Sequence, residues 1–263
     1  MLLVIDIGNT NTVIGVYDEE NLRARFRVAT DLKSTSDQLV ATLFNMFMIH
    51  NFDINNINDT IISCVVPDVL YNWQSANRKL FSKEAIIVDD TLDTGIVIDY
   101  ENPKEVGADR IVDAVACFDK YGGPAIVVDM GTAITLDVIT KDGRYLGGSI
   151  APGIRIAQDG LFGKTAKLPK IELREPKSPI ATTTVDSINA GIIYGYIGMI
   201  DKLIEVIVDE IDRTRGIKIE DINIIATGGY SELISASSKY IEVIEPDLML
   251  DGLRIIYDRN KNK

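Results

Sequence analysis

The chain has 263 residues, of which 46% are hydrophobic and 25% are charged, and its net charge is −12. This composition is typical of a globular protein rather than a disordered one, and the length allows one large domain or two of ordinary size. The acidic balance argues against a nucleic-acid-binding protein, which would display basic patches. It does not exclude a polyphosphate ligand, because backbone N–H groups and a bound cation can neutralise phosphate.

Several classes of protein are excluded by what the chain lacks. The start, MLLVIDIGNT, has no basic segment and turns polar at Asp6, so it is not a signal peptide, and no apolar run reaches the ~18 residues of a membrane span. Cys64 and Cys117 lie in apolar stretches, which predicts buried, reduced thiols. His50 is the only histidine, so His-based metal sites and Ser-His-Asp triads lack partners. We expect a cytoplasmic protein that binds neither membranes nor nucleic acids.

Residues 2–12 and 126–135 form an internal repeat. They read LLVIDIGNTNT and IVVDMGTAIT, and each is a β-branched run that ends in Asp-x-Gly-Asn/Thr. The two aspartates, Asp6 and Asp129, lie 123 positions apart, close to half the chain. Such self-similarity predicts that the chain is built from two related halves.

The segments that follow each copy are also parallel. After Asp6 we expect strands at 13–17 and 22–30 around a turn at 18–21, a helix at 36–49 and a buried strand at 61–66. After Asp129 we expect strands at 135–139 and 144–152 around a turn at 141–143, a helix at 185–215 and a strand at 222–227. Residues three or four apart give the long helix an apolar stripe, made of Ile188, Ile192, Tyr196, Ile200, Leu203, Ile207 and Ile211.

The pattern predicts an α/β fold of two βββαβα halves with the active site in a cleft between them. We place the halves at 1–115 and 116–263, with the join in a helix near 110–121.

The two Asp-Gly turns are candidate phosphate sites. A turn of Gly, Asn and Thr after a buried strand points several backbone N–H groups one way, and such a concavity holds phosphate oxygens. Gly8 allows close backbone approach, and side-chain donors follow it at Asn9, Thr10, Asn11 and Thr12. Asp6 can face phosphate only across a cation, so we expect it to hold Mg²⁺ through water. An ordinary hairpin is the alternative, but two copies favour turns that grip the two ends of a triphosphate.

A third glycine turn follows the last predicted strand, in ATGGY at 226–230. Gly228 and Gly229 would let a nucleotide base or ribose lie against bare backbone, and a simple strand-to-helix turn is the alternative. No Gly-x-x-x-x-Gly-Lys-Ser/Thr occurs in the chain, which excludes a Walker-type NTPase.

If the triphosphate held by these turns donates a phosphoryl group, its acceptor needs a group that orients the attacking hydroxyl and takes its proton. Asp109 is the best candidate, because it follows the small residues Gly107 and Ala108 and precedes an apolar helical run. The alternative is an aspartate that only caps a helix. The guanidinium of Arg110 is suited to grip a carboxylate at two points, although an ion pair with Asp113 one turn later is also open.

Six motifs in order resemble the type III pantothenate kinase family, in the superfamily of acetate kinase, sugar kinases, heat-shock chaperone ATPases and actin. They are DIGNTNT (6–12), GADR (107–110), DMGTA (129–133), GGSIAPG (147–153), TTTVDSINAGIIYGY (182–196) and ATGG (226–229). The resemblance covers nearly the whole chain. One departure is Thr183-Thr184, where the family often has Asn-Thr, which leaves the role of Thr183 open and keeps the hydroxyl at Thr184.

The resemblance implies a duplicated actin-like, ribonuclease-H-like fold and ATP-dependent phosphorylation of pantothenate to 4′-phosphopantothenate, the first step of coenzyme A biosynthesis. It implies Asp109 as the proton acceptor and Asp129 as the holder of a monovalent cation, K⁺ or NH₄⁺, although chemistry alone would let Asp129 share the Mg²⁺. The implied ATP-binding residues are Asp6, Ile7, Gly8, Asn9, Thr10, Asn11, Thr12, Val13, Thr132, Gly228 and Gly229. The implied pantothenate-binding residues are Tyr100, Gly107, Ala108, Asp109, Arg110 and Thr184.

The resemblance also points to a homodimer. Gly191, Gly195 and Gly198 recur among apolar residues of the long predicted helix, and such residues let helices approach closely, although packing within one chain is the alternative. Two other functions stay open, namely another small-molecule kinase of the same superfamily and a nucleotide-binding regulatory protein without turnover. The intact set of Asp6, Asp109 and Asp129 argues against the second.

Overall fold

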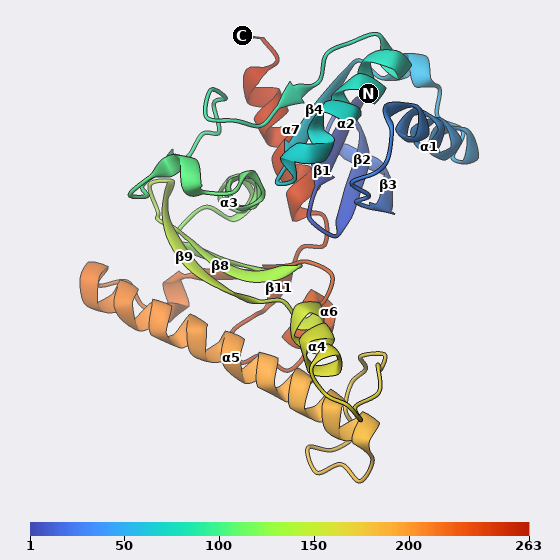
Figure 1. Ribbon diagram of the computed structural model, residues 1–263. Coiled ribbons are helices and arrows are strands. Elements are labelled where there is room, and N and C mark those ends of the chain that lie inside the picture. Colours follow the sequence, from blue (N-terminus) through green and yellow to red (C-terminus); the bar gives the residue numbers. More distant parts are fainter. Residues whose placement is uncertain (263) are drawn as a thin grey trace. The chain divides into compact units, whose positions relative to one another are not determined.

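The computed structural model describes residues 1–262, and its contacts divide the chain into two compact units (Figure 1). The first unit comprises Met1–Val97, Glu101–Asp119 and the C-terminal stretch from Leu248, and the second comprises Ile98–Tyr100 and Lys120–Asp247.

The first unit contains a five-stranded sheet of order β3-β2-β1-β4-β5. Its strands are β1 (Leu2–Ile7), β2 (Asn11–Asp18), β3 (Asn21–Ala29), β4 (Asp59–Cys64) and β5 (Ile86–Ile87). β1, β2 and β3 are antiparallel, whereas β1, β4 and β5 are parallel. Helices α1 (Ser36–Ile49) and α2 (Pro67–Phe81) pack together, and their buried Leu43, Phe47 and Trp73 join the strand residues in one core.

The last helix of the chain belongs to the first unit. α7 (Leu248–Asn260) contacts β1, β2 and β4, and Figure 1 draws it in red beside them. A Cβ on Gly15 of β2 would come 3.1 Å from a methyl of Leu250, so glycine lets the helix lie close to the sheet. Helix α3 (Ala108–Tyr121) also begins in this unit. The predicted halves therefore differ from the observed units mainly in α7, which the sequence pattern had grouped with residues 116–263.

The second unit repeats the strand order of the first. Its sheet runs β11-β10-β7-β8-β9-β6, with β6 (Val97–Ile98), β7 (Ala125–Met130), β8 (Ala133–Ile139), β9 (Arg144–Pro152), β10 (Asn223–Thr227) and β11 (Val243–Ile244). Read from β9 to β11, the order matches β3 to β5. β1 and β7 are buried at every position except the fifth, where Asp6 and Asp129 are each half-buried. The predicted duplication is confirmed.

Helix α5 (Thr184–Arg215) covers one face of the second sheet (Figure 1). Its buried apolar positions are Ile188, Ala190, Ile193, Ile197, Ile200, Ile204, Val208 and Ile211. The predicted stripe was partly wrong, because Ile192, Tyr196, Leu203 and Ile207 lie at the edge of the core. Apolar residues occur in adjacent pairs along this helix, and only packing against the sheet decides which member of each pair is buried.

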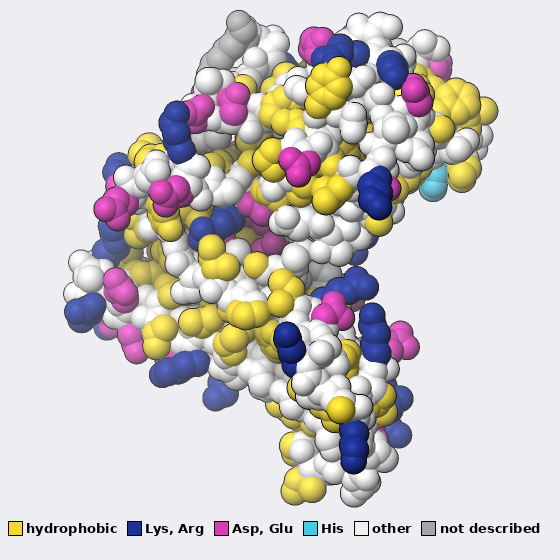
Figure 2. All heavy atoms as spheres, in the orientation of Figure 1, with side chains coloured by type: hydrophobic (Ala, Val, Ile, Leu, Met, Phe, Trp, Pro, Cys, Tyr) yellow, Lys and Arg dark blue, Asp and Glu magenta, His cyan; other side chains and the backbone are white. Residues whose placement is uncertain are grey.

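The remaining helices are short. They are α4 (Ile154–Gly163), α6 (Ser231–Ser235) and three 3-10 turns at Ile54–Asn56, Pro103–Glu105 and Ile219–Asp221. Basic, acidic and apolar side chains are interspersed on the face shown in Figure 2. In the described part of the chain, no helix combines the length and apolar character that a membrane span needs.

Candidate active site

The first Asp-Gly turn lies at the end of β1, where Asp6 is flanked in register by Val13 of β2 and Ser63 of β4. The Gly8 N–H donates to the Asn11 carbonyl at 3.1 Å, which closes the turn. A Cβ on Gly8 would lie 3.1 Å from that carbonyl oxygen, so a side chain at this position would be tightly packed. The sequence predicted this glycine turn correctly, and the structure shows how it closes.

Thr30 holds the turn from behind. Its hydroxyl donates to the Gly8 carbonyl at 2.7 Å, and its N–H donates to the Thr10 carbonyl at 3.0 Å. The Thr12 hydroxyl lies 3.0 Å from that of Thr30, and Thr12 is completely buried, so this hydroxyl braces the turn. Asn9 is exposed. Thr30 was not predicted from the sequence, where the only signal for it is its position at the end of the strand that precedes the first helix.

The GADR motif forms the start of α3. The Ile111 N–H donates to the Gly107 carbonyl at 3.2 Å, so Asp109 lies within the first turn rather than at the cap. One oxygen of Asp109 accepts the Arg110 N–H at 2.8 Å. A Cβ on Gly107 would collide with that same oxygen. Glycine is therefore needed at 107 for the carboxylate to fold back over the helix start.

Arg110 is only 9% exposed and Asp113, one turn later, only 3% exposed. A guanidinium this deeply buried needs anionic or hydrogen-bonding partners to offset its desolvation. The requirement suits a residue that receives a carboxylate, and it equally suits an internal pair.

In the second unit, Asp129 and Gly228 come together from distant parts of the sequence. β7 and β10 pair in parallel with Asp129 opposite Thr227, and Gly228 follows with a φ of 92°. A Cβ on Gly228 would lie 2.5 Å from one Asp129 oxygen, and a Cβ on Gly131 would lie 3.1 Å from the other. Both glycine turns therefore wrap one carboxylate, while Thr132 in the same turn is exposed.

Asp6 and Asp129 each offer one carboxylate, so a cation at either residue would take most of its ligands from phosphate and water. Within residues 1–262, no group of three or more His, Cys, Asp and Glu side chains is placed to hold a metal. Mg²⁺ in kinases is typically bound through one or two carboxylates, substrate phosphates and water. A single strand-end aspartate beside a glycine turn is compatible with that pattern.

Gly229 borders a hollow of about 490 Å³ in the second unit. Its walls come from α5 and α6 and from the segment at 175–176, and they include Tyr194 and Tyr230. A flat heterocycle would suit this hollow, because the hollow lies beside the Gly228-Gly229 turn and has tyrosine rings in its wall.

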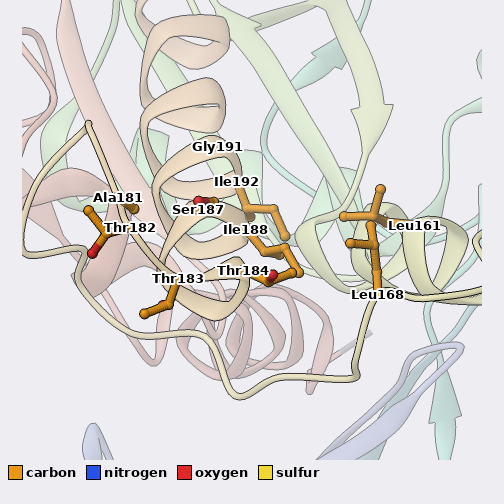
Figure 3. A pocket seen from close by; sticks show the side chains of 10 residues that line it. All are labelled: Leu161, Leu168, Ala181, Thr182, Thr183, Thr184, Ser187, Ile188, Gly191 and Ile192. Atoms are coloured by element: carbon orange, nitrogen blue, oxygen red, sulfur yellow. The ribbon is translucent and has the colours of Figure 1, made fainter.

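Thr184 lies at the start of α5, beside a hollow of about 580 Å³ (Figure 3). Figure 3 shows Thr184, Ile188 and Ile192 on the helix side and Leu161 and Leu168 across from them. The hollow is open to solvent, with apolar walls and threonine and serine hydroxyl groups at its edge.

Thr183 caps α5. Its hydroxyl accepts the Asp186 N–H at 3.1 Å and donates to the Asp186 carboxylate at 2.7 Å. The Thr183 hydroxyl, followed by the Arg174 guanidinium, holds the pKa of Asp186 below its usual value. The residue whose role the sequence left open thus serves as the N-cap of the helix that carries Thr184.

Tyr100 follows β6, and its ring lies against Gly147 of β9. It is half-buried and follows the edge strand of the second sheet.

Both cysteines are free thiols. Cys117 is fully buried as predicted, whereas Cys64 is half-buried and donates to the Val66 carbonyl at 3.2 Å. Burial raises the pKa of Cys64, which makes it a poor nucleophile at neutral pH.

Comparison with known proteins identifies the family. The sequence model of the type III pantothenate kinase family matches residues 2–206. The chain is 48% identical over 262 residues to a type III pantothenate kinase of Finegoldia magna, covering 100% of this chain and 98% of that relative. The chain belongs to the type III pantothenate kinase family. It is therefore an enzyme that transfers a phosphoryl group.

Two solved structures share the fold. A Campylobacter jejuni protein assigned to the Baf family of transcriptional activators has a TM-score of 0.61 at 21% identity, covering 99% of this chain and 100% of its own. An activator of 2-hydroxyisocaproyl-CoA dehydratase from Clostridium difficile has a TM-score of 0.53 at 10% identity, covering 99% and 94%. At these identities the likeness concerns the fold alone, which is the duplicated actin-like fold predicted for this family.

Proposed function

We propose that this chain transfers the γ-phosphoryl group of ATP to the primary hydroxyl of pantothenate, giving 4′-phosphopantothenate for coenzyme A biosynthesis. The observation that carries the proposal is the 48% identity to a type III pantothenate kinase over the whole chain. The Asp-Gly turns of the two units support it, because each follows a buried strand with a half-buried aspartate at its fifth position. In the second unit, Gly131 and Gly228 also lie against that carboxylate.

On the donor side, we assign the phosphates to the two turns. Backbone N–H groups around Gly8 and the exposed Asn9 would bind phosphate oxygens in the first unit, and Thr132 would do so in the second. The adenosine would lie against Gly228 and Gly229. Phosphoryl transfer depends mainly on positioning and charge stabilisation, so a first turn held by the hydrogen bonds of Thr30 suits the task.

On the acceptor side, we assign proton acceptance to Asp109. Its carboxylate is held at the start of α3 by the Arg110 N–H, which fixes its direction before substrate arrives. The Arg110 guanidinium would bind the pantothenate carboxylate, the end of the substrate away from the reacting hydroxyl. Tyr100 and Thr184 would line the remainder of the substrate.

We assign Mg²⁺ to Asp6, through water, and a monovalent cation, K⁺ or NH₄⁺, to Asp129. When bound, these ions would neutralise charge on the nucleotide phosphates. Oxygen ligands are what each ion prefers, and the half-buried carboxylates of both residues provide them.

We further propose that the chain works as a homodimer through α5. Gly191, Gly195 and Gly198 are exposed, and a Cβ built on each meets nothing within 4 Å. Internal packing therefore does not explain the glycines, whereas close approach of a second helix would. Both cysteines are free, which supports a cytoplasmic location, since thiols stay reduced there.

A coupled assay of ADP release, with and without pantothenate, tests the proposal on the purified protein. Release that requires pantothenate is expected. Release that ignores pantothenate but responds to another hydroxylated metabolite would indicate a different kinase of the superfamily. Nucleotide binding without turnover would indicate a regulatory protein instead.

A further inference from the structure

The ring of Tyr100 rests on the backbone of Gly147. A Cβ built on Gly147 would lie 2.7 Å from Cε2 and 3.1 Å from Cδ2 of Tyr100. Real Cβ atoms do not approach ring carbons to 2.7 Å, so no side chain fits at 147 while Tyr100 keeps its place. Gly147 also has a φ of 96°, which L-residues rarely adopt.

Asp99, the residue before Tyr100, binds the segment to β9. The Asp99 N–H donates to the Tyr145 carbonyl at 2.8 Å. The Arg144 guanidinium donates from Nε and Nη2 to one Asp99 oxygen, at 3.1 and 3.0 Å. Only Ile98–Tyr100 of this stretch belongs to the second unit, because the chain belongs to the first unit up to Val97 and again from Glu101. The hydrogen bonds of Asp99 to Tyr145 and Arg144 therefore hold the backbone next to Tyr100 against β9.

The surface beneath Tyr100 is rigid. Tyr145 is fully buried, and its ring centroid lies 6.5 Å from that of Tyr100. Its hydroxyl donates to one oxygen of the buried Asp137 at 2.6 Å, and the Thr135 hydroxyl donates to the other at 2.9 Å. Buried side chains held by satisfied hydrogen bonds have little freedom to move. Tyr100 thus lies beside a buried tyrosine whose hydroxyl is hydrogen-bonded within the sheet.

We propose that Gly147 and the Asp99–Arg144 pair are positioning residues that fix the ring of Tyr100 for binding pantothenate. The inference rests on the proposed function, in which Tyr100 lines the substrate. Gly147 acts by leaving room for the ring, and Arg144 acts by holding the segment in register. Neither residue needs to touch the substrate.

The first test is Gly147→Ala, with Gly216→Ala as the matched control. Gly216 also has a positive φ, 68°, but a Cβ on it meets nothing within 4 Å, so it reproduces the backbone strain without the collision. We expect Gly147→Ala to lower kcat/KM for pantothenate by about 10- to 100-fold, the loss that a misplacement of about 1 Å causes. KM for ATP should stay near the parental value, and Gly216→Ala should change neither constant.

The second test avoids backbone strain and decides the matter if Gly147→Ala fails to fold. Arg144 and Asp99 are partly exposed, with side chains 39% and 48% accessible. Because exposed pairs contribute little, we expect Arg144→Gln to raise KM for pantothenate only about two- to fivefold. Arg144→Lys keeps the charge and should recover part of that loss.

Tyr100→Ala and the ADP-release assay of the parent together separate failure of the inference from failure of the proposed function. If the parent releases ADP only with pantothenate but Tyr100→Ala leaves KM for pantothenate unchanged, Tyr100 is not at the substrate site, and the inference is overturned while the proposed function stands. If Tyr100→Ala raises that KM while Gly147→Ala and Arg144→Gln do not, only the inference is overturned. If the inference holds, Gly147→Ala added to Tyr100→Ala should cause no further loss, because the ring that it displaces is already gone.

Discussion

The hydroxyl of Tyr257 in α7 donates to the carboxylate of Asp59 at the start of β4, 2.7 Å away and 198 residues earlier in the chain. A second bond of the same kind joins the Tyr17 hydroxyl to Asp251 at 2.6 Å, across 234 residues. These contacts attach the last helix to the first sheet. Burial, followed by the hydrogen bond to Asp59, raises the pKa of Tyr257 to about 12 from its usual 10.0.

The first prediction concerns alkaline stability. Because the folded protein holds the Tyr257 proton more tightly than the unfolded chain, the pair stabilises the fold fully below pH 10 and loses that effect between pH 10 and about 12. Tyr257→Phe should lower the free energy of unfolding by about 1 kcal/mol at pH 8, a value reduced from the usual range for bonds to charged groups because the pair is partly exposed. Urea unfolding of the parent and the variant at pH 8, 10 and 11 measures this difference.

The difference in the free energy of unfolding between the parent and Tyr257→Phe should be smaller at pH 11 than at pH 8. Tyr71→Phe is the matched control, because Tyr71 is 70% exposed and its loss should leave the stability curve unchanged. A gap of constant size from pH 8 to 11 would contradict the assignment.

The second prediction separates Asp109 from Asp6. Asp109→Asn keeps the size of the side chain but removes the proton acceptor, so nucleotide binding should persist while kcat falls. General-base contributions are about 10²–10⁴-fold, and we expect the lower part of that range because the hydroxyl proton leaves late in a loose transition state. Asp6→Asn should instead give a defect that high Mg²⁺ partly relieves. The measurements are kcat, nucleotide affinity and Mg²⁺ dependence of both variants.

If Asp109→Asn turns over at the parental rate, or loses nucleotide binding first, the carboxylate serves the helix start rather than the reaction. The hydrogen bond that it accepts from the Arg110 N–H would then be its main role.

The third prediction follows from the collision between a Cβ at 107 and Asp109. Gly107→Ala should push the carboxylate away from its present direction, so kcat should fall by about tenfold or more, in line with the sensitivity of catalysis to small misplacements. Gly160→Ala is the control, since a Cβ there meets nothing within 4 Å. Steady-state kinetics with circular dichroism checks both, and parental kcat in Gly107→Ala would show that Asp109 tolerates a new position.

The fourth prediction tests Arg110. Arg110→Gln should raise KM for pantothenate by roughly 10- to 150-fold, because a lost charge-assisted pair costs about 1.5–3 kcal/mol, while KM for ATP stays nearly constant. The two Michaelis constants, measured together with the melting temperature, distinguish binding from folding. An equal loss toward both substrates with a lowered melting temperature would mean that the buried guanidinium is structural.

The fifth prediction concerns assembly. Gly195→Lys places a long charged side chain in the middle of the exposed glycine positions of α5 and should convert the dimer to a monomer of 29.0 kDa. Ala41→Lys makes the same kind of change at an exposed position of α1 and should leave the mass unchanged. Light scattering at micromolar concentration reads out both, and a parental mass of 29.0 kDa would remove the dimer from the proposal.

The sequence by itself determined the duplicated architecture and the strand ends at which Asp6 and Asp129 lie. Strand periodicity, turn residues and the long amphipathic helix are local signals, so the predicted 144–152 strand and the 36–49 and 185–215 helices agree with β9, α1 and α5 within a residue. Family motifs added the candidate roles. None of these inferences needed to know which distant segments meet.

Tertiary structure decided the features that depend on contacts between distant residues. Three such contacts join segments that are far apart in the chain. They are the packing of α7 on the first sheet, the contact of Gly228 with Asp129, and the contact of the Tyr100 ring with Gly147. Packing also determined which face of α5 is buried, since two neighbouring apolar stripes fit its sequence equally well. It likewise determined that the Thr12 side chain is buried, since the sequence does not distinguish it from the neighbouring hydroxyl of Thr10. Local signals specify the elements, whereas the burial of apolar area chooses how they meet.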